Sequence, residues 1–293
     1  MSENKLAVEK DSKKFSVALQ SDALQKLISD TLGDENRKKR FVAAISSAVG
    51  QNPDLQNCDA GTVLVAGLVG ESLNLSPSPQ LGQFYLVPFN DRKNGRVVAQ
   101  FQIGYKGYLQ LAMRSGQYKK INVVAIKKGE LINYDPLEEE LKVNLIEDEL
   151  KREKSETTGY YAMFEYLNGF KKTMYWSKQK MEAHANKYSQ AYRAKKGFSF
   201  WEKDFDGMGF KTMLRQLISK WGIMSTELQE AYVKDMASLD ESGNVNYVDN
   251  TEVVEEEIEK EIRIHADSGE VLDFKEEIKK EMKEEQPKNN RGF

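Results

Sequence analysis

Residues 1–58 carry apolar side chains at helical spacing. Positions three and four apart recur among them, which places the apolar side chains on one face of each helix. The apolar residues with this spacing are Phe15, Val17, Leu19, Leu24, Leu27, Ile28, Phe41, Val42 and Ile45. The pattern predicts an N-terminal helical region but indicates no chemistry.

A further helix is predicted from Asp59 through GTVLVAGLVGESL, ending before Pro77. Aspartate accepts hydrogen bonds from the free amide groups at a helix start, and proline cannot continue a helix. The apolar side chains lie on all sides of this segment, so we expect it to be buried.

Two hairpins are indicated by runs of β-forming residues joined through Asn-Gly. QFYLVPF and RVVAQFQI flank Asn94-Gly95, and GYYAMFEYL and FKKTMYW flank Asn168-Gly169. Asn-Gly readily adopts the positive φ angles of a tight hairpin turn. Pro88 lacks an amide hydrogen, which predicts an edge position for the first strand.

Helical spacing returns in YKGYLQLAMRS, which Gly116 ends, and INVVAIKKGEL then has the composition of a strand. Ser177 is a predicted cap of the helix that follows the second hairpin. The order of helices, hairpins and helices predicts an α+β fold with a mostly antiparallel sheet packed against helices.

From Ala237 the sequence becomes polar and then densely charged, which predicts a linker and a disordered acidic tail over residues 237–293. Two sparse apolar stripes in the tail could form helices on a partner protein. Their residues are Val254, Ile258 and Ile262, then Val271, Phe274, Ile278 and Met282.

The charge is unevenly distributed along the chain. The net charge is −3, yet residues 92–129 hold nine lysines and arginines and no acidic residue. Residues 1–239 carry 35 basic and 29 acidic groups, whereas residues 240–293 carry 8 and 17. A basic body favours a polyanionic partner, and nucleic acid is the first candidate.

Residues 105–114 form an amphipathic helix in projection, with Lys106, Gly107, Gln110 and Arg114 on one arc. Glycine lowers helix stability by about 1 kcal/mol relative to alanine. Gly107 therefore either lets a ligand approach the backbone or packs closely against the protein. The downstream lysines favour a ligand; they are Lys119, Lys120, Lys127 and Lys128.

Residues 210–221 repeat this pattern, with Lys211, Arg215 and Ser219 opposite an apolar arc and Thr212 and Gln216 at its flanks. The two helices are predicted to form the walls of a cationic cleft.

The segment before this helix interleaves aromatic and cationic residues: Tyr192, Arg193, Lys195, Lys196, Phe198, Phe200, Trp201 and Lys203. Single-strand binding proteins stack bases on rings and bind phosphates with cations. Arg193, Lys196 and Trp201 are candidate DNA contacts, although core packing is the simpler interpretation for most of these rings.

Several activities lack sequence support. The chain has no G-x-x-x-x-G-K-[ST] segment, so we expect no use of ATP. Neither histidine has metal-ligand spacing, and we expect His184 at the surface. Glu202, Asp204 and Asp206 could hold Mg²⁺ for a nuclease, although a salt-bridged loop is the simpler interpretation. We therefore expect no cofactor, no metal and no enzyme activity.

A single cysteine, Cys58, excludes an internal disulfide, and no run is long and apolar enough for a membrane span. We expect a soluble protein of the cytoplasm.

The segment GQFYLVPF through AIKKGEL resembles the RecT family of phage single-strand annealing proteins. The matching pattern is Y-x-x-P-F, then Q-x-Q-x-G-Y-K-G and L-A-x-R-S-G-Q-Y. The later YWSKQKMEAH and the run W-x-K-D-F-D-x-M to K-T-x-L-R-x-x-x-S-K-W-G also resemble this family, so the similarity covers roughly residues 60–225.

This resemblance implies an annealing-protein-like core at residues 59–236, a narrow basic DNA groove, and assembly as a ring or helical filament. Residues 1–58 match no motif of the family, and we expect oligomer contacts in this helical region. It implies DNA-binding roles for matching residues: Tyr105, Lys106, Arg114, Lys119, Lys120, Lys211, Thr212 and Arg215. Gly107, Gln110, Lys128, Arg193, Lys196 and Trp201 complete the candidate set.

The predicted function is ATP-independent binding of single-stranded DNA and annealing of complementary strands in phage-type recombination, inside a bacterial host. A passive single-strand protecting protein is the alternative. By resemblance, the host single-strand binding protein and a phage exonuclease are candidate partners of the tail.

Overall fold

A computed structural model describes residues 15–91, 94–195, 197, 199–223, 225–235, 237–239 and 245–246. The chain divides into two compact units, residues 1–250 and residues 251–293. The second unit, which holds the predicted tail helices, lies outside the described residues.

The described part of the N-terminal region, from Phe15 onward, is helical, as predicted. Its elements are α1 (Phe15–Ala18), α2 (Asp22–Leu32), α3 (Glu35–Gln51), the 3-10 helix η1 (Pro53–Asn57) and α4 (Ala60–Ser72). Asp59 caps α4 by accepting a hydrogen bond from the Gly61 amide at 2.9 Å. Residues from Gly61 to Gly70 are all buried, which confirms the predicted interior helix.

The first hairpin pairs β1 (Phe84–Asp91) with β2 (Arg96–Ile103), in antiparallel register from Phe84–Ile103 to Asp91–Arg96. Gly95 has a φ of +63° in the turn, and β1 lies at the sheet edge, as Pro88 predicted. Two late strands, β8 (Ala237–Leu239) and β9 (Val245–Asn246), extend this sheet in the order β1-β2-β8-β9. The linker predicted to begin at Ala237 therefore begins instead with a strand paired to β2.

The second sheet follows helix α5 (Tyr105–Arg114) and has the antiparallel order β3-β6-β7. Its strands are β3 (Tyr118–Lys127), β6 (Thr157–Tyr166) and β7 (Lys171–Ser177). The connection from β3 to β6 holds a small hairpin, β4 (Leu131–Asp135) and β5 (Glu140–Val143), and helix α6 (Glu149–Lys154). The α+β fold with antiparallel sheets is confirmed.

The remaining helices are α7 (Lys178–Tyr188), α8 (Gln190–Arg193), α9 (Phe200–Lys203), α10 (Phe205–Trp221) and α11 (Thr226–Lys234). Ser177 caps α7, as predicted, by accepting from the Lys180 amide at 3.2 Å.

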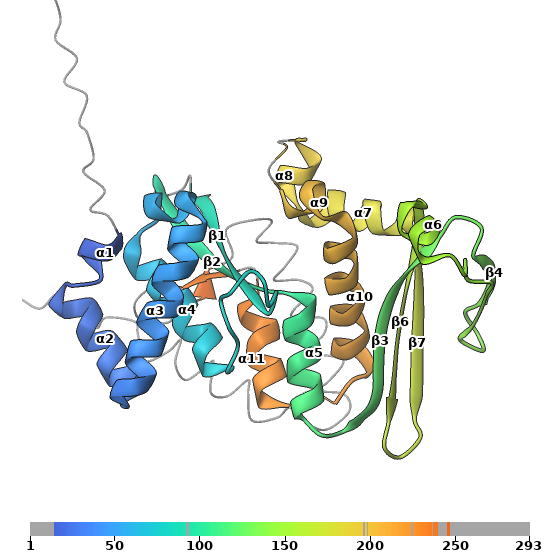
Figure 1. The fold of residues 1–293 in the computed structure, drawn as a ribbon, viewed down its shortest axis with the longest axis horizontal. Coiled ribbons are helices and arrows are strands. Elements are labelled where there is room, and N and C mark those ends of the chain that lie inside the picture. Colours follow the sequence, from blue (N-terminus) through green and yellow to red (C-terminus); the bar gives the residue numbers. More distant parts are fainter. Residues whose placement is uncertain are drawn as a thin grey trace, which may run out of the picture. The chain divides into compact units, whose positions relative to one another are not determined.

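Helix α10 belongs to two apolar clusters. Leu214 and Ile218 pack with the N-terminal helices, the first hairpin and α5, whereas Met213 and Leu217 pack with β6 and α7. Figure 1 shows α10 between α5 and the β3-β6-β7 sheet. The side chains of this helix are consequently covered on more than one face.

Candidate nucleic-acid interface

Helix α5 exposes two of its predicted cations. Lys106 and Arg114 are exposed, and Gln110 is half-buried. The Arg114 guanidinium donates to the Leu73 carbonyl oxygen at 2.6 Å, at the end of α4. Tyr105 is half-buried, with its ring edge-on to Phe210 of α10 at 5.6 Å between centroids.

Gly107 is a packing glycine, so the prediction that it faces a ligand is wrong. A Cβ atom at this position would lie 2.2 Å from the backbone oxygen of Gln83 and 2.7 Å from Cγ1 of Ile103. The residue is buried against the chain that enters β1. Close approach of the protein backbone explains the absence of a side chain here.

The polar arc predicted on α10 is also buried, so Lys211 and Thr212 do not form the open wall of a cleft beside α5. Lys211 is 5% exposed and Thr212 is 6% exposed. The Lys211 ammonium contacts the Asp235 carboxylate at 2.8 Å. Burial lowers the pKa of Lys211, and the neighbouring Asp235 opposes this effect.

Asp235 links this ion pair to two other elements. One carboxylate oxygen also accepts from the Ile103 amide at 3.0 Å, and the other accepts from the Tyr108 hydroxyl at 3.3 Å. Arg215 is half-buried, with its guanidinium 4.3 Å from the centroid of the Tyr232 ring of α11. The structure therefore brings Lys211 and Arg215 of α10 to residues in or just after α11, and it buries Thr212.

In the aromatic segment before α10, Trp201 is part of the hydrophobic core and its ring is not exposed. This indole is 5% exposed, with Phe205 at 5.2 Å and Tyr192 at 6.2 Å between ring centroids. Trp201 therefore belongs to the core, the simpler of the two interpretations for these rings, and it is not open for stacking. Arg193 is exposed at the end of α8, and Lys196 lies outside the described residues.

The lysines of β3 stand at its two ends. Lys119 and Lys120 are exposed at the start, where Lys119 forms an ion pair with Glu165 at 2.6 Å. Lys128 is exposed just past the other end. Nine residue steps along a strand span about 30 Å, so these cations cannot bind one small ligand together.

Lys127 points to a carboxylate, because its ammonium lies 3.8 Å from Asp206 and 2.9 Å from the Thr157 hydroxyl oxygen.

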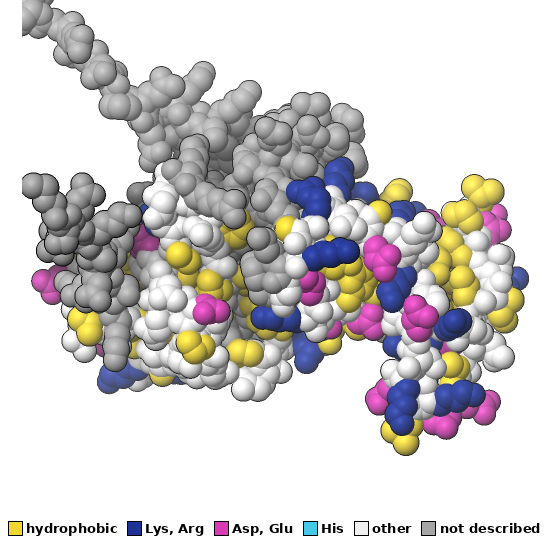
Figure 2. All heavy atoms as spheres, turned by 90° about the horizontal axis from the view of Figure 1, so that it is seen from above, with side chains coloured by type: hydrophobic (Ala, Val, Ile, Leu, Met, Phe, Trp, Pro, Cys, Tyr) yellow, Lys and Arg dark blue, Asp and Glu magenta, His cyan; other side chains and the backbone are white. Residues whose placement is uncertain are grey.

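Seen from above, lysine and arginine side chains gather over the α7–α9 end, with some acidic side chains between them (Figure 2). Exposed cations in this part of the chain include Lys187, Arg193, Lys195 and Lys203.

The sequence interpretation missed a second group of cations beside β7, although FKKTMYWSKQK alternates cations with aromatic residues. Lys172 lies 3.6 Å from the centroid of the Trp221 ring, and Lys180 lies 4.3 Å from that of Trp176. Two exposed lysines belong to the same elements: Lys171 is the first residue of β7, and Lys220 precedes Trp221 at the end of α10.

The three carboxylates weighed as a Mg²⁺ site serve the local fold. Glu202 forms a capping box with Ser199 at the start of α9, and Asp204 caps α10 through the Gly207 amide at 2.9 Å. Asp206 accepts from the Tyr160 hydroxyl at 2.6 Å.

His184 is half-buried among aromatic rings, so its predicted surface position is wrong. Its ring lies 4.3 Å from Tyr188 and 5.6 Å from Trp176, between centroids. Burial, followed by Arg215, Lys187 and Lys220, lowers the pKa of His184 to about 3. The imidazole is therefore neutral at physiological pH.

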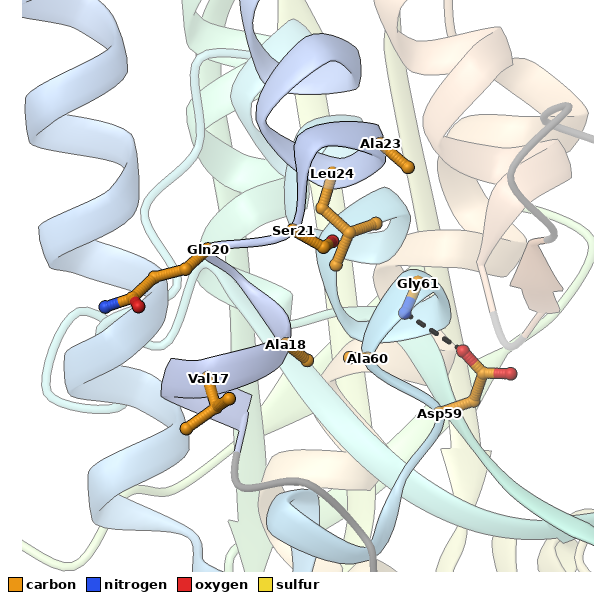
Figure 3. A pocket seen from close by; sticks show the side chains of 9 residues that line it. All are labelled: Val17, Ala18, Gln20, Ser21, Ala23, Leu24, Asp59, Ala60 and Gly61. Carbon is orange, nitrogen blue, oxygen red and sulfur yellow. Dashed lines mark hydrogen bonds between the residues drawn. The ribbon is translucent and has the colours of Figure 1, made fainter.

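A pocket between the α1–α2 turn and the start of α4 has an apolar lining without lysine or arginine (Figure 3). Its acidic side chain, Asp59, is turned to the Gly61 amide. Such a lining offers no counter-charge to phosphate, so this pocket is not a candidate phosphate site. Within the described residues, no helix has the length and apolar character needed to cross a membrane.

The sequence is similar to known proteins and to the model of one protein family. It is 38% identical to the uncharacterized protein YqaK of Bacillus subtilis (strain 168) over 239 residues, which cover 82% of this chain and 78% of YqaK. It is 28% identical to Protein RecT of Escherichia coli (strain K12) over 199 residues, covering 67% of this chain and 71% of that protein. The model of the RecT family matches residues 39–251, and the chain therefore belongs to the RecT family.

Proposed function

We propose that this protein binds single-stranded DNA and anneals complementary strands without consuming ATP. Membership of the RecT family supports this function. The structural observation that carries it is the set of exposed lysines, Lys106, Lys120 and Lys128, for which the described residues provide no ion-pair partner. Lys120 stands opposite Glu165 in the β3–β6 register, and the pKa of this carboxyl is lowered by Lys119 and further by Lys120. Exposed cations spread over an extended surface suit a phosphate backbone.

Annealing needs no chemical fuel. Each stacked base-pair step is worth about 1.4 kcal/mol, so a ten-pair match releases roughly 14 kcal/mol. What opposes pairing is repulsion between two polyanionic strands, and lysine and arginine side chains reduce that repulsion. The protein therefore needs to hold strands and cancel charge, not to supply energy.

We further propose that copies of the chain assemble head-to-tail into a ring or filament. Cations at both ends of β3, about 30 Å apart, could then follow one strand from copy to copy. The tail, residues 240–293, is a proposed contact for a host single-strand binding protein or a phage exonuclease.

The direct test mixes two labelled complementary oligonucleotides with the full chain, without nucleotide, and follows duplex formation. We expect faster annealing than in buffer. Slower annealing would indicate the alternative, a passive protecting protein. Cleavage of labelled DNA after incubation with Mg²⁺ would contradict the assignment to a non-catalytic protein.

The interface is tested by Lys120→Ala, with Lys26→Ala as the matched control because Lys26 is an exposed lysine of α2. For single strands, the slope of log K against log salt changes by about 0.7 for each phosphate contact. We expect Lys120→Ala to lower the magnitude of the slope by about this amount and Lys26→Ala to leave it unchanged. If the slope of log K against log salt were the same in Lys120→Ala and Lys26→Ala, Lys120 would not contact a phosphate.

A further inference from the structure

Trp221, the last residue of α10, is 51% exposed, although the sequence places it on an apolar arc. The Lys172 ammonium lies 3.6 Å from the centroid of its ring, and Lys172 also forms an ion pair with Glu139. A cation at this distance covers one face of the ring. Trp221 is thus held from one side, which reduces the entropy lost when a ligand contacts its other side.

A second tryptophan and lysine pair lies farther along β7. Trp176 has the Lys180 ammonium 4.3 Å from its ring centroid. Lys172 and Trp176 are four residues apart on one strand, so they share a face of the sheet and lie about 13 Å apart. β7 is an edge strand in the order β3-β6-β7, and this face of it lies beside α7 and α10.

The charge between these pairs is not balanced. Burial and then the positive charge of Lys220 lower the pKa of Lys180. The side chains of Lys180 and Lys220 are nevertheless largely exposed. Within the described part of the chain, neither lysine forms an ion pair with a carboxylate. Two neighbouring ammonium groups without a counter-charge favour binding of an anion.

We propose that Trp221 stacks on a base of single-stranded DNA and that Lys180 and Lys220 bind phosphates of the same strand. This inference rests on the proposed function and adds a stacking site that is distinct from the buried Trp201. The exposed ring of Trp221 and the ammonium groups of Lys180 and Lys220 come from the ends of α10 and α7 that lie beside β7. A ring beside ammonium groups matches the bases and phosphates of a single strand. An acidic protein segment would engage the lysines but would leave the indole without a planar partner.

The test measures the affinity of the full-length protein for oligo(dT) and for an abasic phosphodiester strand of the same length. Trp221→Ala should lose about five- to hundred-fold in affinity for oligo(dT) and keep its affinity for the abasic strand. Trp221→Phe should retain most of the oligo(dT) affinity. Lys180→Ala and Lys220→Ala should weaken both strands alike, because phosphate contacts do not depend on bases.

Leu150→Ala is the matched control, since Leu150 is an exposed apolar residue of α6. Unchanged oligo(dT) affinity in Trp221→Ala would refute stacking, and equal loss on both strands would show that the ring only supports the fold. Unchanged DNA affinities with an altered oligomeric mass would assign Trp221 to a contact between protein copies. If the unmodified protein bound neither strand, the proposed function itself would fail.

Discussion

At the residue scale, the lack of space around position 107 explains why this residue is a glycine. An added methyl group would meet the Gln83 oxygen and Ile103, and overpacking of this kind costs about 1–3 kcal/mol or more. We expect Gly107→Ala to lower the free energy of unfolding measured in urea. Gly50→Ala is the control: Gly50 has open space around it, so the better helix propensity should stabilise α3 by up to about 1 kcal/mol. A stabilised Gly107→Ala protein would show that the backbone can yield.

His184 gives the protein a predictable response to acid. The pKa of His184 is lowered from 6.5 to about 3 in the fold, so the unfolded chain takes up its proton first. The stabilising contribution is present above pH 6.5 and is lost as pH falls toward the folded value. At pH 5 the loss should reach up to about 2 kcal/mol.

His184→Gln should remove this dependence, so unfolding midpoints of the two proteins should diverge less at pH 5 than at pH 7.5. His265→Gln serves as the control, because it changes the other histidine of the sequence. If the difference between the two unfolding midpoints did not change with pH, the pKa of the His184 imidazole would be the same in the folded and the unfolded protein.

At the scale of elements, the Lys211–Asp235 ion pair joins α10 to the residue after α11. Removing one partner of a buried pair costs about 3–5 kcal/mol, because the other charge stays buried without compensation. We expect Lys211→Met to destabilise the protein by this amount in denaturant titrations, and Lys220→Met, on the exposed end of the same helix, to change stability little. A stable Lys211→Met protein with weakened DNA binding would restore Lys211 to the interface.

The elements themselves were largely predictable, because their signals are local. Asn94-Gly95 and Asn168-Gly169 fix both hairpins, and Asp59 and Ser177 mark helix starts. The accessible face of α10 was not predictable in the same way. Lys211 is polar in projection, but its partner lies 24 residues later in the sequence. Spacing within one helix carries no information about which second element covers it.

The same limit explains which of the candidate DNA-binding residues are exposed and which are buried. Exposed Lys106, Arg114, Lys119, Lys120, Lys128 and Arg193 agree with the polar positions expected from the sequence. Gly107 and Trp201 are buried because β1 and the α7–α9 region pack against them. The Trp221–Lys172 pair arises only when β7 and α10 meet, whereas Trp176 and Lys180 are four residues apart and meet locally.

At the scale of the whole molecule, charge divides at the border between the two compact units. Residues 251–293 hold 14 acidic and 8 basic residues, a net charge of −6, so the remainder carries +3. Truncation after Asn250 keeps β8 and β9. We expect the truncated protein to bind oligo(dT) equally or more tightly at low salt, because a net negative segment opposes a polyanion, and the difference should shrink at high salt.

Recombination frequency in cells should fall in the same truncated protein if the tail recruits a partner. Weaker oligo(dT) binding after truncation would show that residues 251–293 support the interface. Equal recombination by both proteins would reduce the tail to a solubilising role.

The hydrogen bond between Asp235 and Ile103 also affects how the chain folds while it is being synthesised. The carboxylate that accepts from the Ile103 amide lies 132 residues farther along the chain. At synthesis rates of about 5–20 residues per second, roughly 7–26 s pass between the appearance of these two residues. During that interval β2 has neither Asp235 nor β8 beside it, and an unpaired strand edge can pair with another nascent copy. We therefore expect newly made chains on a crowded polysome to misassemble more readily than completed chains.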